Sequence, residues 1–285
     1  MWRHATGMLL LDRPRIVGIV NVTPDSFSDG GRFLSQDDAR RHAERLIAEG
    51  ADVIDIGGES TRPQGATVVE AAEEKRRVIP VIEAVRREHP SVPISIDTTK
   101  ASVAGAALEA GASIVNDVSA FRLDAHMAVV CAAAGAGVVL MHSRGDVATM
   151  ATFAHADYGD DPVGEVIEEL RGAVGNAIDA GIARDRVVVD PGLGFSKRSE
   201  VSVSALAQLE RFAALGYPVL VGASRKRFIG EIIGVPTPSE RAAGTAGANV
   251  VALARGARLF RVHDVKISRD ALDVAWTVLR SGAAW

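Results

Sequence analysis

The chain has 285 residues, of which 47% are hydrophobic and 24% charged, and this balance excludes an intrinsically disordered protein. Lys and Arg number 32 and Asp and Glu 36, which gives a formal net charge of −4 without any long basic run. The charge therefore argues against a nucleic-acid partner or an anionic membrane surface, and no apolar stretch reaches the roughly 18 residues of a membrane span.

Short apolar runs rich in Val and Ile alternate along the chain with longer segments of helical period. Each run is nearly continuous rather than alternating, which is typical of a strand buried on both faces of a parallel sheet. Eight such runs are predicted strands: Ile16–Val22, Val53–Ile56, Pro93–Ile96, Ser113–Val115, Gly137–Met141, Arg186–Val189, Pro218–Val221 and Arg258–Val262.

The segments between these runs are predicted helices. Three of them carry a clear apolar stripe: Asp37–Glu49, Val69–Arg87 and Asp264–Leu279. Glycines stand just past three predicted helices, at the position where a residue of positive φ commonly ends a helix: Gly50, Gly111 and Gly181.

Strands that alternate with helices indicate βαβ units and a parallel sheet. Eight strands in about 270 residues favour a single (β/α)8 TIM barrel, with a doubly wound sheet of fewer units as the alternative. No Pro- or Ser-rich linker divides the chain, so residues 1–285 are predicted to be one domain. Residues 1–14 are expected to cap the bottom of the barrel, where the strands begin.

Polar side chains follow every predicted strand, at the end where TIM barrels carry their active sites. One polar strand end is usually a helix cap, but eight of them are poorly explained in this way. A first group offers carboxylate and amide groups: Asp97, Asn116 and Asp190. These suit the N–H edge of a flat heterocycle such as an aminopyrimidinone, and the alternative is a buried polar network that only holds the barrel rim.

A second group is cationic or amide in character: Asn21, Arg62, Arg261 and His263. Because Arg presents a planar fork to phosphate oxygens, this group predicts a phosphate site. The alternative is a surface ion pair between Arg261 and Asp264. Lys226 lies between the two groups and is interpreted as a charged, hydrogen-bonding side chain rather than a Schiff-base amine.

Three further side chains have less specific interpretations. Phe195, in a Gly-rich run, is either part of the core or a wall for a flat ligand, and His142 is either structural or functional. Cys131 is the only cysteine, so no intrachain disulfide forms, and it is expected to be an inert buried thiol. This fits a reducing, cytoplasmic compartment, and Met1–Leu11 is too short and too interrupted for a secretory signal.

Eight motifs occur along essentially the whole chain, in this order: GIVNVTPDSFSDGG, DIGGESTRPQGA, SIDT, VNDVSA, LMHSRG, DPGLGFSK, VGASRKRFIG and RVHDV. Together they resemble the dihydropteroate synthase family, and the first motif combined with Ser-Arg-Lys is highly specific. The resemblance implies a TIM barrel, usually dimeric, that uses Mg2+ and is a target of sulfonamides. It implies condensation of 6-hydroxymethyl-7,8-dihydropterin diphosphate with p-aminobenzoate to give 7,8-dihydropteroate and diphosphate.

The resemblance also implies roles for individual residues. It assigns the pterin to Asp97, Asn116, Met141, Asp190 and Lys226. It assigns the diphosphate to Asn21, Arg62, Arg261 and His263, with Asn21 also at Mg2+. It assigns p-aminobenzoate to Phe27, Thr61, Arg62, Pro63, Phe195 and Ser224. The catalytic residues would be Asp29, Arg62, Lys226, Arg261 and His263.

The chain departs from the family pattern where Arg227 stands in place of a common Ser after Ser-Arg-Lys, near the expected carboxylate of p-aminobenzoate. Two other functions share a pterin-binding barrel. A methyltetrahydrofolate-dependent methyltransferase would not need the Ser-Arg-Lys strand or Arg261-Val262-His263. A non-catalytic pterin-binding paralogue is disfavoured by the intact segments Asn21–Gly31 and Gly57–Pro63.

Overall fold

The computed structural model of the protein describes residues 1–22, 36–59 and 69–281. Within them, one sheet of eight parallel strands has the order β8-β7-β6-β5-β4-β3-β10-β9. Its strands are β3 (Arg15–Asn21), β4 (Val53–Gly57), β5 (Ile94–Asp97), β6 (Ile114–Asp117), β7 (Gly137–Met141), β8 (Val187–Asp190), β9 (Leu220–Val221) and β10 (Leu259–Val262). A parallel bridge from Val189 to Val219 brings the edge strands β8 and β9 together. The predicted TIM barrel is confirmed, and the doubly wound alternative is wrong.

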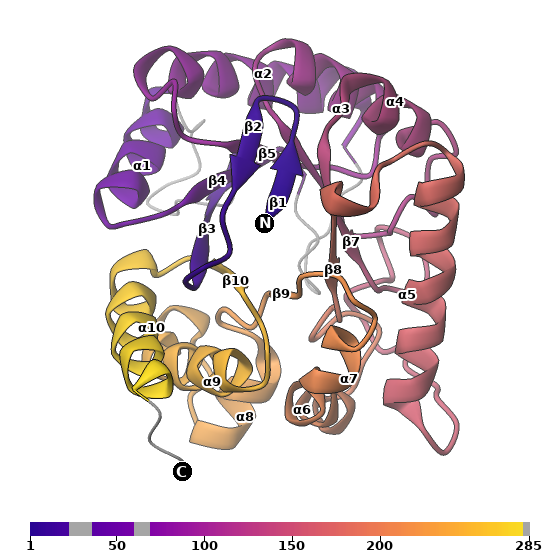
Figure 1. Ribbon diagram of the computed structural model, residues 1–285, viewed down its shortest axis with the longest axis vertical. Helices are drawn as coiled ribbons and strands as arrows, with labels where there is room; N and C mark the ends of the chain where they lie inside the picture. The colour runs from indigo at the N-terminus through magenta and orange to yellow at the C-terminus, as the bar shows by residue number, and fades with distance from the viewer. Residues whose placement is uncertain (23–35, 60–68, 282–285) are drawn as a thin grey trace.

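Helices form a ring around the strands (Figure 1). They are α1 (Gln36–Ala48), α2 (Ala71–Glu88), α3 (Ala101–Glu109), α4 (Met127–Ala134), α5 (Pro162–Asp179), α6 (Ser199–Ala207), α7 (Leu209–Ala213), α8 (Arg227–Ile233), α9 (Ala242–Ala254) and α10 (Val265–Arg280), with short 3-10 turns at Arg184–Arg186 and Pro238–Glu240. The predicted helix-ending glycines Gly50, Gly111 and Gly181 have φ of 101°, 114° and 95°. Only glycine adopts this backbone without strain, so the three predicted helix ends are confirmed.

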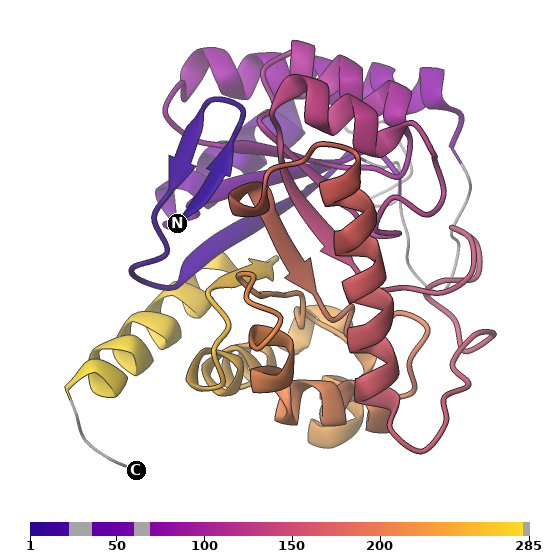
Figure 2. The same cartoon turned by 45° about the vertical axis from the view of Figure 1, so that its right-hand side comes forward.

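An antiparallel hairpin of β1 (Trp2–His4) and β2 (Gly7–Leu9) precedes the barrel. The indole Nε1 of Trp2 donates to the carbonyl of Arg186 (2.8 Å), and the N–H of Ala5 donates to the carbonyl of Ser113 (3.1 Å). Both acceptors immediately precede barrel strands, so the hairpin covers the end where the strands begin (Figure 2). The predicted N-terminal cap is confirmed.

The barrel interior is layered because inward side chains recur every second residue along a strand. The layer beneath the site is apolar and packs against Trp2: Val17, Val53, Ile114, Val139, Val188, Leu220 and Leu259. Two residues further along several of these strands, the inward side chains become polar: Asp55, Asn116, Asp190 and Arg261. This apolar layer is the floor of the site. The polar residues therefore lie directly above the floor and face the end of the barrel where the strands finish.

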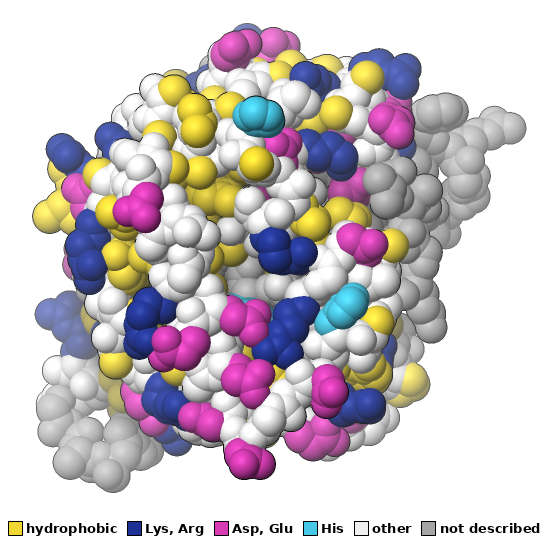
Figure 3. Space-filling view, turned by 90° about the vertical axis from the view of Figure 1, so that its right-hand side faces the viewer, with side chains coloured by type: hydrophobic (Ala, Val, Ile, Leu, Met, Phe, Trp, Pro, Cys, Tyr) yellow, Lys and Arg dark blue, Asp and Glu magenta, His cyan; other side chains and the backbone are white. Residues whose placement is uncertain are grey.

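The face that α5 presents carries basic and acidic side chains intermixed rather than a patch of one sign (Figure 3). Arg144 pairs there with Glu165 (2.9 Å), and Arg211 pairs with Asp161 (2.7 Å). No helix in residues 1–22, 36–59 and 69–281 is both long enough and apolar enough to cross a membrane.

Candidate active site

Arg261 of β10 lies at the centre of the polar residues and bonds directly to two other strands. Its Nε donates to Oδ2 of Asp55 on β4 (2.6 Å), and its Nη2 donates to Oδ2 of Asp97 on β5 (2.6 Å). Asn116 of β6 donates from Nδ2 to the same oxygen of Asp55 (3.2 Å). The two groups separated in the sequence analysis are therefore in contact, because Arg261 is paired with Asp97 of the first group and, through Asp55, linked to Asn116.

The surface ion pair between Arg261 and Asp264 that the sequence left open is wrong. Asp264 instead binds Arg225, at 3.0 Å from Nε and 2.7 Å from Nη2. This leaves the guanidinium of Arg261 directed into the barrel. The side chain of Arg261 is 22% exposed, whereas that of its partner Asp55 is fully buried.

Burial sets the proton affinity of the carboxylates in this cluster. It raises the pKa of Asp97 above its usual range, and the positive charge of Arg261 only partly opposes this effect. Burial raises the pKa of Asp190 to about 6, although its Oδ1 accepts a hydrogen bond from the N–H of Gly192 (2.7 Å). The raised pKa values mean that burial disfavours the ionised carboxylates, and further N–H donors from a ligand would stabilise them.

Lys226 packs against Phe195, with its Nζ 3.9 Å from the centre of the ring. Gly194, at φ 76°, lets the chain pass this side chain, because a Cβ there would lie 3.2 Å from Cδ of Lys226. Burial lowers the pKa of Lys226 to about 8, Arg261 acts in the same direction, and Asp190 opposes both. The amine is thus still largely protonated at pH 7, which favours the charged interpretation over a Schiff base.

Phe195 packs against apolar side chains and also forms a wall of the candidate site. Its ring is 9% exposed and packs in a small apolar cluster with Met141 and Met150, while Lys226 lies over it. Met141 is itself the last residue of β7, at the same end of the barrel as the polar cluster. Met141, which was assigned to the pterin, and Phe195, which was assigned to p-aminobenzoate, therefore lie together.

Ser224 and His263 are adjacent, although the resemblance implies that they bind different substrates. Ser224 Oγ lies 2.9 Å from Nδ1 of His263 and accepts the backbone N–H of His263 (3.1 Å). Asn21 is the last residue of β3 and pairs in register with Gly57 of β4. Phe27, Asp29, Thr61, Arg62 and Pro63 lie outside the described residues.

A Lys–His–Glu chain beneath the loop that carries Phe195, buried at Lys197 and His142 and exposed at Glu169, was not predicted as functional. Lys197 is 1% exposed, with Nζ 2.7 Å from His142 Nδ1, and donates to the carbonyls of Gly192 (3.2 Å) and Phe195 (3.1 Å). His142 Nε2 lies 3.0 Å from Oε2 of Glu169. Burial lowers the pKa of His142 to about 4, so the imidazole is neutral, accepts from Lys197 and donates to Glu169. His142 therefore has a structural role in holding this loop.

We expect Lys197→Met to loosen the loop that carries Phe195. Methionine fills similar space but leaves the carbonyl of Phe195 and Nδ1 of His142 without the Lys197 donor, and the carbonyl of Gly192 with only the N–H of Phe195, which together costs about 3 kcal/mol in the free energy of unfolding. Chemical denaturation measures this loss. Lys75→Met is the control, because Lys75 lies on α2, away from this loop, and it is expected to unfold like the parent protein. A Lys197→Met protein as stable as the parent would contradict a holding role.

Arg241 was also missed by sequence reasoning. Its guanidinium donates to the carbonyls of Val235 (2.9 Å), Arg225 (3.0 Å) and Lys226 (3.3 Å). Arg225 has a positive φ of 60°, which is strained for a non-glycine residue. Arg241 thus fixes the turn that presents Ser224 and Lys226, and no local motif marked it.

The expectation for Cys131 has a clear outcome in the structure, whereas the position of Arg227 relative to p-aminobenzoate stays a prediction. Cys131 is fully buried, and burial raises its pKa to about 12, so the thiol is inert as predicted. Arg227 is exposed and lies over the ring of Phe153, with Cζ 4.5 Å from its centre, and Arg198 lies 5.2 Å from the same ring.

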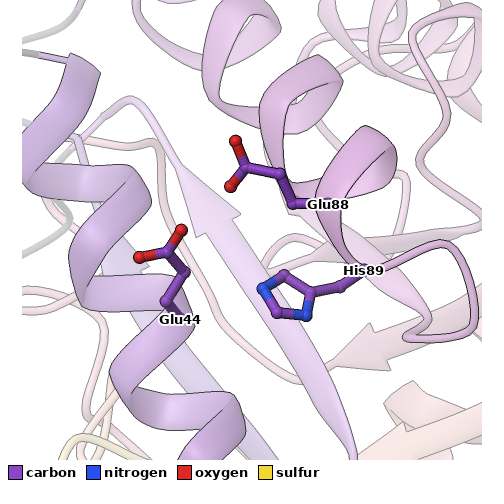
Figure 4. Close-up of side chains that lie close together, drawn as sticks. All are labelled: Glu44, Glu88 and His89. Atoms are coloured by element: carbon purple, nitrogen blue, oxygen red, sulfur yellow. The ribbon is translucent and has the colours of Figure 1, made fainter.

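Glu44, Glu88 and His89 form the one cluster in the described part of the chain whose ligand atoms are close enough to hold a metal (Figure 4). They lie between α1 and α2, in the outer ring of helices. Arg40 already donates to Glu44 and to Glu88, so it neutralises these carboxylates. This cluster differs from the metal position predicted at Asn21.

Comparison with known proteins identifies the family of the chain. The family described as pterin binding enzyme matches residues 17–263. A dihydropteroate synthase of Bacillus subtilis is 46% identical over 255 residues, covering 90% of this chain and 85% of that protein.

Two solved structures share the fold. The dihydropteroate synthase of Xanthomonas albilineans with 4-aminobenzoic acid has a TM-score of 0.88 at 48% identity, covering 96% of this chain and 95% of that one. The Yersinia pestis enzyme in a sulfonamide drug complex has a TM-score of 0.90 at 39% identity, covering 98% and 100%. By sequence and by structure, the chain belongs to the dihydropteroate synthase family of pterin-binding enzymes.

Proposed function

We propose that this chain condenses 6-hydroxymethyl-7,8-dihydropterin diphosphate with p-aminobenzoate, giving 7,8-dihydropteroate and diphosphate in folate biosynthesis. The observation that carries the proposal is the cluster of Asp97, Asn116 and Arg261 at one end of a barrel of this family. It combines acceptors for the edge of a heterocycle with a guanidinium for phosphate oxygens. These are the two recognition tasks that the pterin substrate poses.

The pterin ring would be held by Asp97, Asn116 and Asp190, with Lys226 and Met141 completing the pocket. Buried carboxylates with raised pKa values favour ligands that donate hydrogen bonds, and the amino and N–H groups of a pterin do so. The amide of Asn116 can both donate and accept. A planar substrate would thus be fixed by its edge in one orientation.

Reaction requires the methylene carbon of the pterin to exchange oxygen for nitrogen. The bond to diphosphate breaks with its electron pair going to oxygen, the amine lone pair forms the new C–N bond, and the amine proton leaves to solvent. Arg261 and His263, with Arg62, would stabilise the leaving diphosphate, and Asp29 would stabilise positive charge on the pterin. An arylamine is neutral near pH 7, so no strong base and no covalent enzyme intermediate are needed.

The p-aminobenzoate site would be formed by Phe195 and Ser224 together with Phe27, Thr61, Arg62 and Pro63. Lys226, which is charged and lies over Phe195, adds a cation beside the aromatic wall. The Xanthomonas albilineans relative is described with 4-aminobenzoic acid and the Yersinia pestis relative with a sulfonamide drug. These two complexes support p-aminobenzoate as the second substrate and sulfonamides as its competitors.

Mg2+ is the cofactor that the family implies, with Asn21 as its protein ligand. The amide oxygen of Asn21 is a suitable donor for this hard cation, which commonly takes few protein ligands and binds substrate phosphates. Asn21 ends β3, beside β10, which carries Arg261. When bound, the ion would neutralise charge on the leaving diphosphate.

The protein is further proposed to be a cytoplasmic homodimer. The single buried cysteine fits a reducing compartment. The last two helices, α9 and α10, pack on each other and leave Val251 and Val274 exposed, at 45% and 67%. Apolar side chains of this kind on adjacent helices suit an interface between two copies.

The test is an assay with both substrates and Mg2+ that follows diphosphate release. We expect release only when p-aminobenzoate is present, together with formation of dihydropteroate detected by mass. Matched reactions omit one substrate each. Binding of the pterin diphosphate without release would favour the non-catalytic paralogue, and methyl transfer from methyltetrahydrofolate to a corrinoid would favour the methyltransferase.

A further inference from the structure

We propose that Asp55 is a positioning residue that fixes the guanidinium of Arg261 and the amide of Asn116, and so couples the diphosphate and pterin ends of the site. This inference rests on the proposed function. Asp55 is neither in the predicted set of site residues nor at the end of its strand. It lies in the middle of β4, inside the apolar run Val53–Ile56.

The position of Asp55 explains why it acts through other residues. Val53, two residues earlier, belongs to the apolar floor. Gly57, two residues later, lies against Asp97, because a Cβ on Gly57 would be 3.4 Å from Cβ of Asp97. Asp55 is therefore between the floor and the substrate-facing layer. It is fully buried and lines a small cavity inside the barrel together with Ser95.

The contacts of Asp55 hold two predicted substrate ligands at one oxygen. Oδ2 accepts from Nε of Arg261 (2.6 Å) and from Nδ2 of Asn116 (3.2 Å). Asp97 accepts a hydrogen bond from Nη2 of Arg261 (2.6 Å), so Asp55 and Asp97 hold the planar guanidinium from two sides. Nη1 donates to no residue in the described ranges, which leaves it for a ligand. One carboxylate thus sets the plane and direction of the fork that would bind phosphate oxygens.

A buried carboxylate directly above the apolar floor of the barrel needs a reason to be retained. Its other oxygen, Oδ1, contacts no hydrogen-bond donor among the described residues. A group placed for stability alone would be expected to satisfy both oxygens, because an unmatched buried acceptor is costly. The arrangement instead matches orientation of Arg261, as a second layer of hydrogen bonds orients the groups that touch a substrate.

The experiment is a double-mutant cycle on binding, with dihydropterin diphosphate as the probe in titration calorimetry. We expect Asp55→Asn to weaken binding about 30-fold in the parent protein but less than about threefold in an Arg261→Gln background. Asp117→Asn is the matched control, because Asp117 is also buried but bonds to the turn at Ser119 and Phe121. Its effect should be the same in both backgrounds.

Several outcomes would overturn the proposal. One is an Asp55→Asn effect that persists in full without the Arg261 guanidinium, and another is no effect in either background. Should Asp55→Asn fail to fold, Arg261→Lys supplies the test, because lysine keeps the charge but cannot bond to Asp55 and Asp97 as a fork. Parent-like binding by Arg261→Lys would then refute orientation by Asp55.

A kinetic readout separates orientation from a general loss of structure. We expect Asp55→Asn to raise KM for the pterin diphosphate while KM for p-aminobenzoate changes less than about twofold. A rise in both would indicate a merely structural role. The binding cycle needs no turnover. A parent protein that binds the pterin diphosphate without releasing diphosphate would therefore refute the proposed function, and the double-mutant cycle would still decide the role of Asp55.

Discussion

Arg261→Ala is expected to lower both the stability of the protein and its activity. The substitution leaves Asp55 fully buried without its cation and removes the charge beside Asp97. Breaking a buried ion pair costs about 3–5 kcal/mol, and the lower end applies here because the side chains of Arg261 and Asp97 are 22% and 17% exposed. Loss of a charged donor to the leaving diphosphate should lower the turnover number about 100- to 1,000-fold.

The stability loss in Arg261→Ala should also depend on pH. Burial already raises the pKa of Asp97 in the parent protein, and Arg261 opposes that rise. Without Arg261 the folded state binds protons more tightly than the unfolded chain, so stability falls as pH rises. The difference in free energy of unfolding from the parent should therefore be smallest near pH 4 and largest near pH 8.

Urea denaturation at several pH values measures this difference. Arg255→Ala is the matched control, because Arg255 forms an exposed pair with Glu210 at 3.2 Å and should change stability by less than about 1 kcal/mol. A variant that keeps parental stability at pH 8, or that loses the same stability at all pH values, would show that Arg261 does not compensate these buried carboxylates.

The secondary structure was predictable because it depends on patterns local in sequence. Runs such as Gly137–Met141 carry no polar side chain, as expected of strands covered on both faces, and the structure has a strand at each predicted run. The least accurate prediction was Pro218–Val221, where regular pairing covers only Leu220–Val221. Val219 contributes an isolated bridge at the seam of the barrel, a constraint that no local pattern expresses.

The candidate site was predictable only in part, because its contacts join distant segments. The rule that barrel function lies at strand ends identified Asp97 and Arg261, yet they are 164 residues apart, and nothing in the sequence says that they pair. Asp55 belongs to the polar end of the predicted strand Val53–Ile56, but it was given no role, because its partners lie on distant strands. The usable signal was its period: two residues after Val53, it faces the same interior.

Lys197 illustrates a second limit of sequence reasoning. Lys197 is the last residue of the DPGLGFSK motif, and a lysine in a Gly-rich loop is ordinarily exposed to solvent. Its full burial depends on His142, 55 residues earlier, and on carbonyls exposed by the turns around Gly192 and Gly194. Such a pocket is a product of the folded loop, so composition and spacing did not reveal it.

Asp97→Asn is expected to separate substrate affinity from stability, unlike Arg261→Ala. The two side chains have nearly the same shape. The amide keeps one acceptor oxygen, but an NH2 group, which donates, replaces the second oxygen of the carboxylate. A pterin edge would then meet a donor instead of an acceptor. Loss of charge-assisted hydrogen bonds of this kind costs about 3 kcal/mol, or roughly 100-fold in affinity for a phosphate-free pterin alcohol.

Stability should change little in Asp97→Asn. Burial already disfavours the charged form of Asp97, and a neutral amide removes that penalty. The amide also loses the ion pair with Arg261, but Arg261 still pairs with Asp55. We expect these effects to offset each other to within about 1 kcal/mol. Calorimetric titration and urea denaturation of one preparation give both quantities, with Asp270→Asn, an exposed partner of Lys266, as the control. Equal pterin affinity in Asp97→Asn and the parent would remove Asp97 from the pterin site, because no other change in the variant would replace the lost acceptor oxygen.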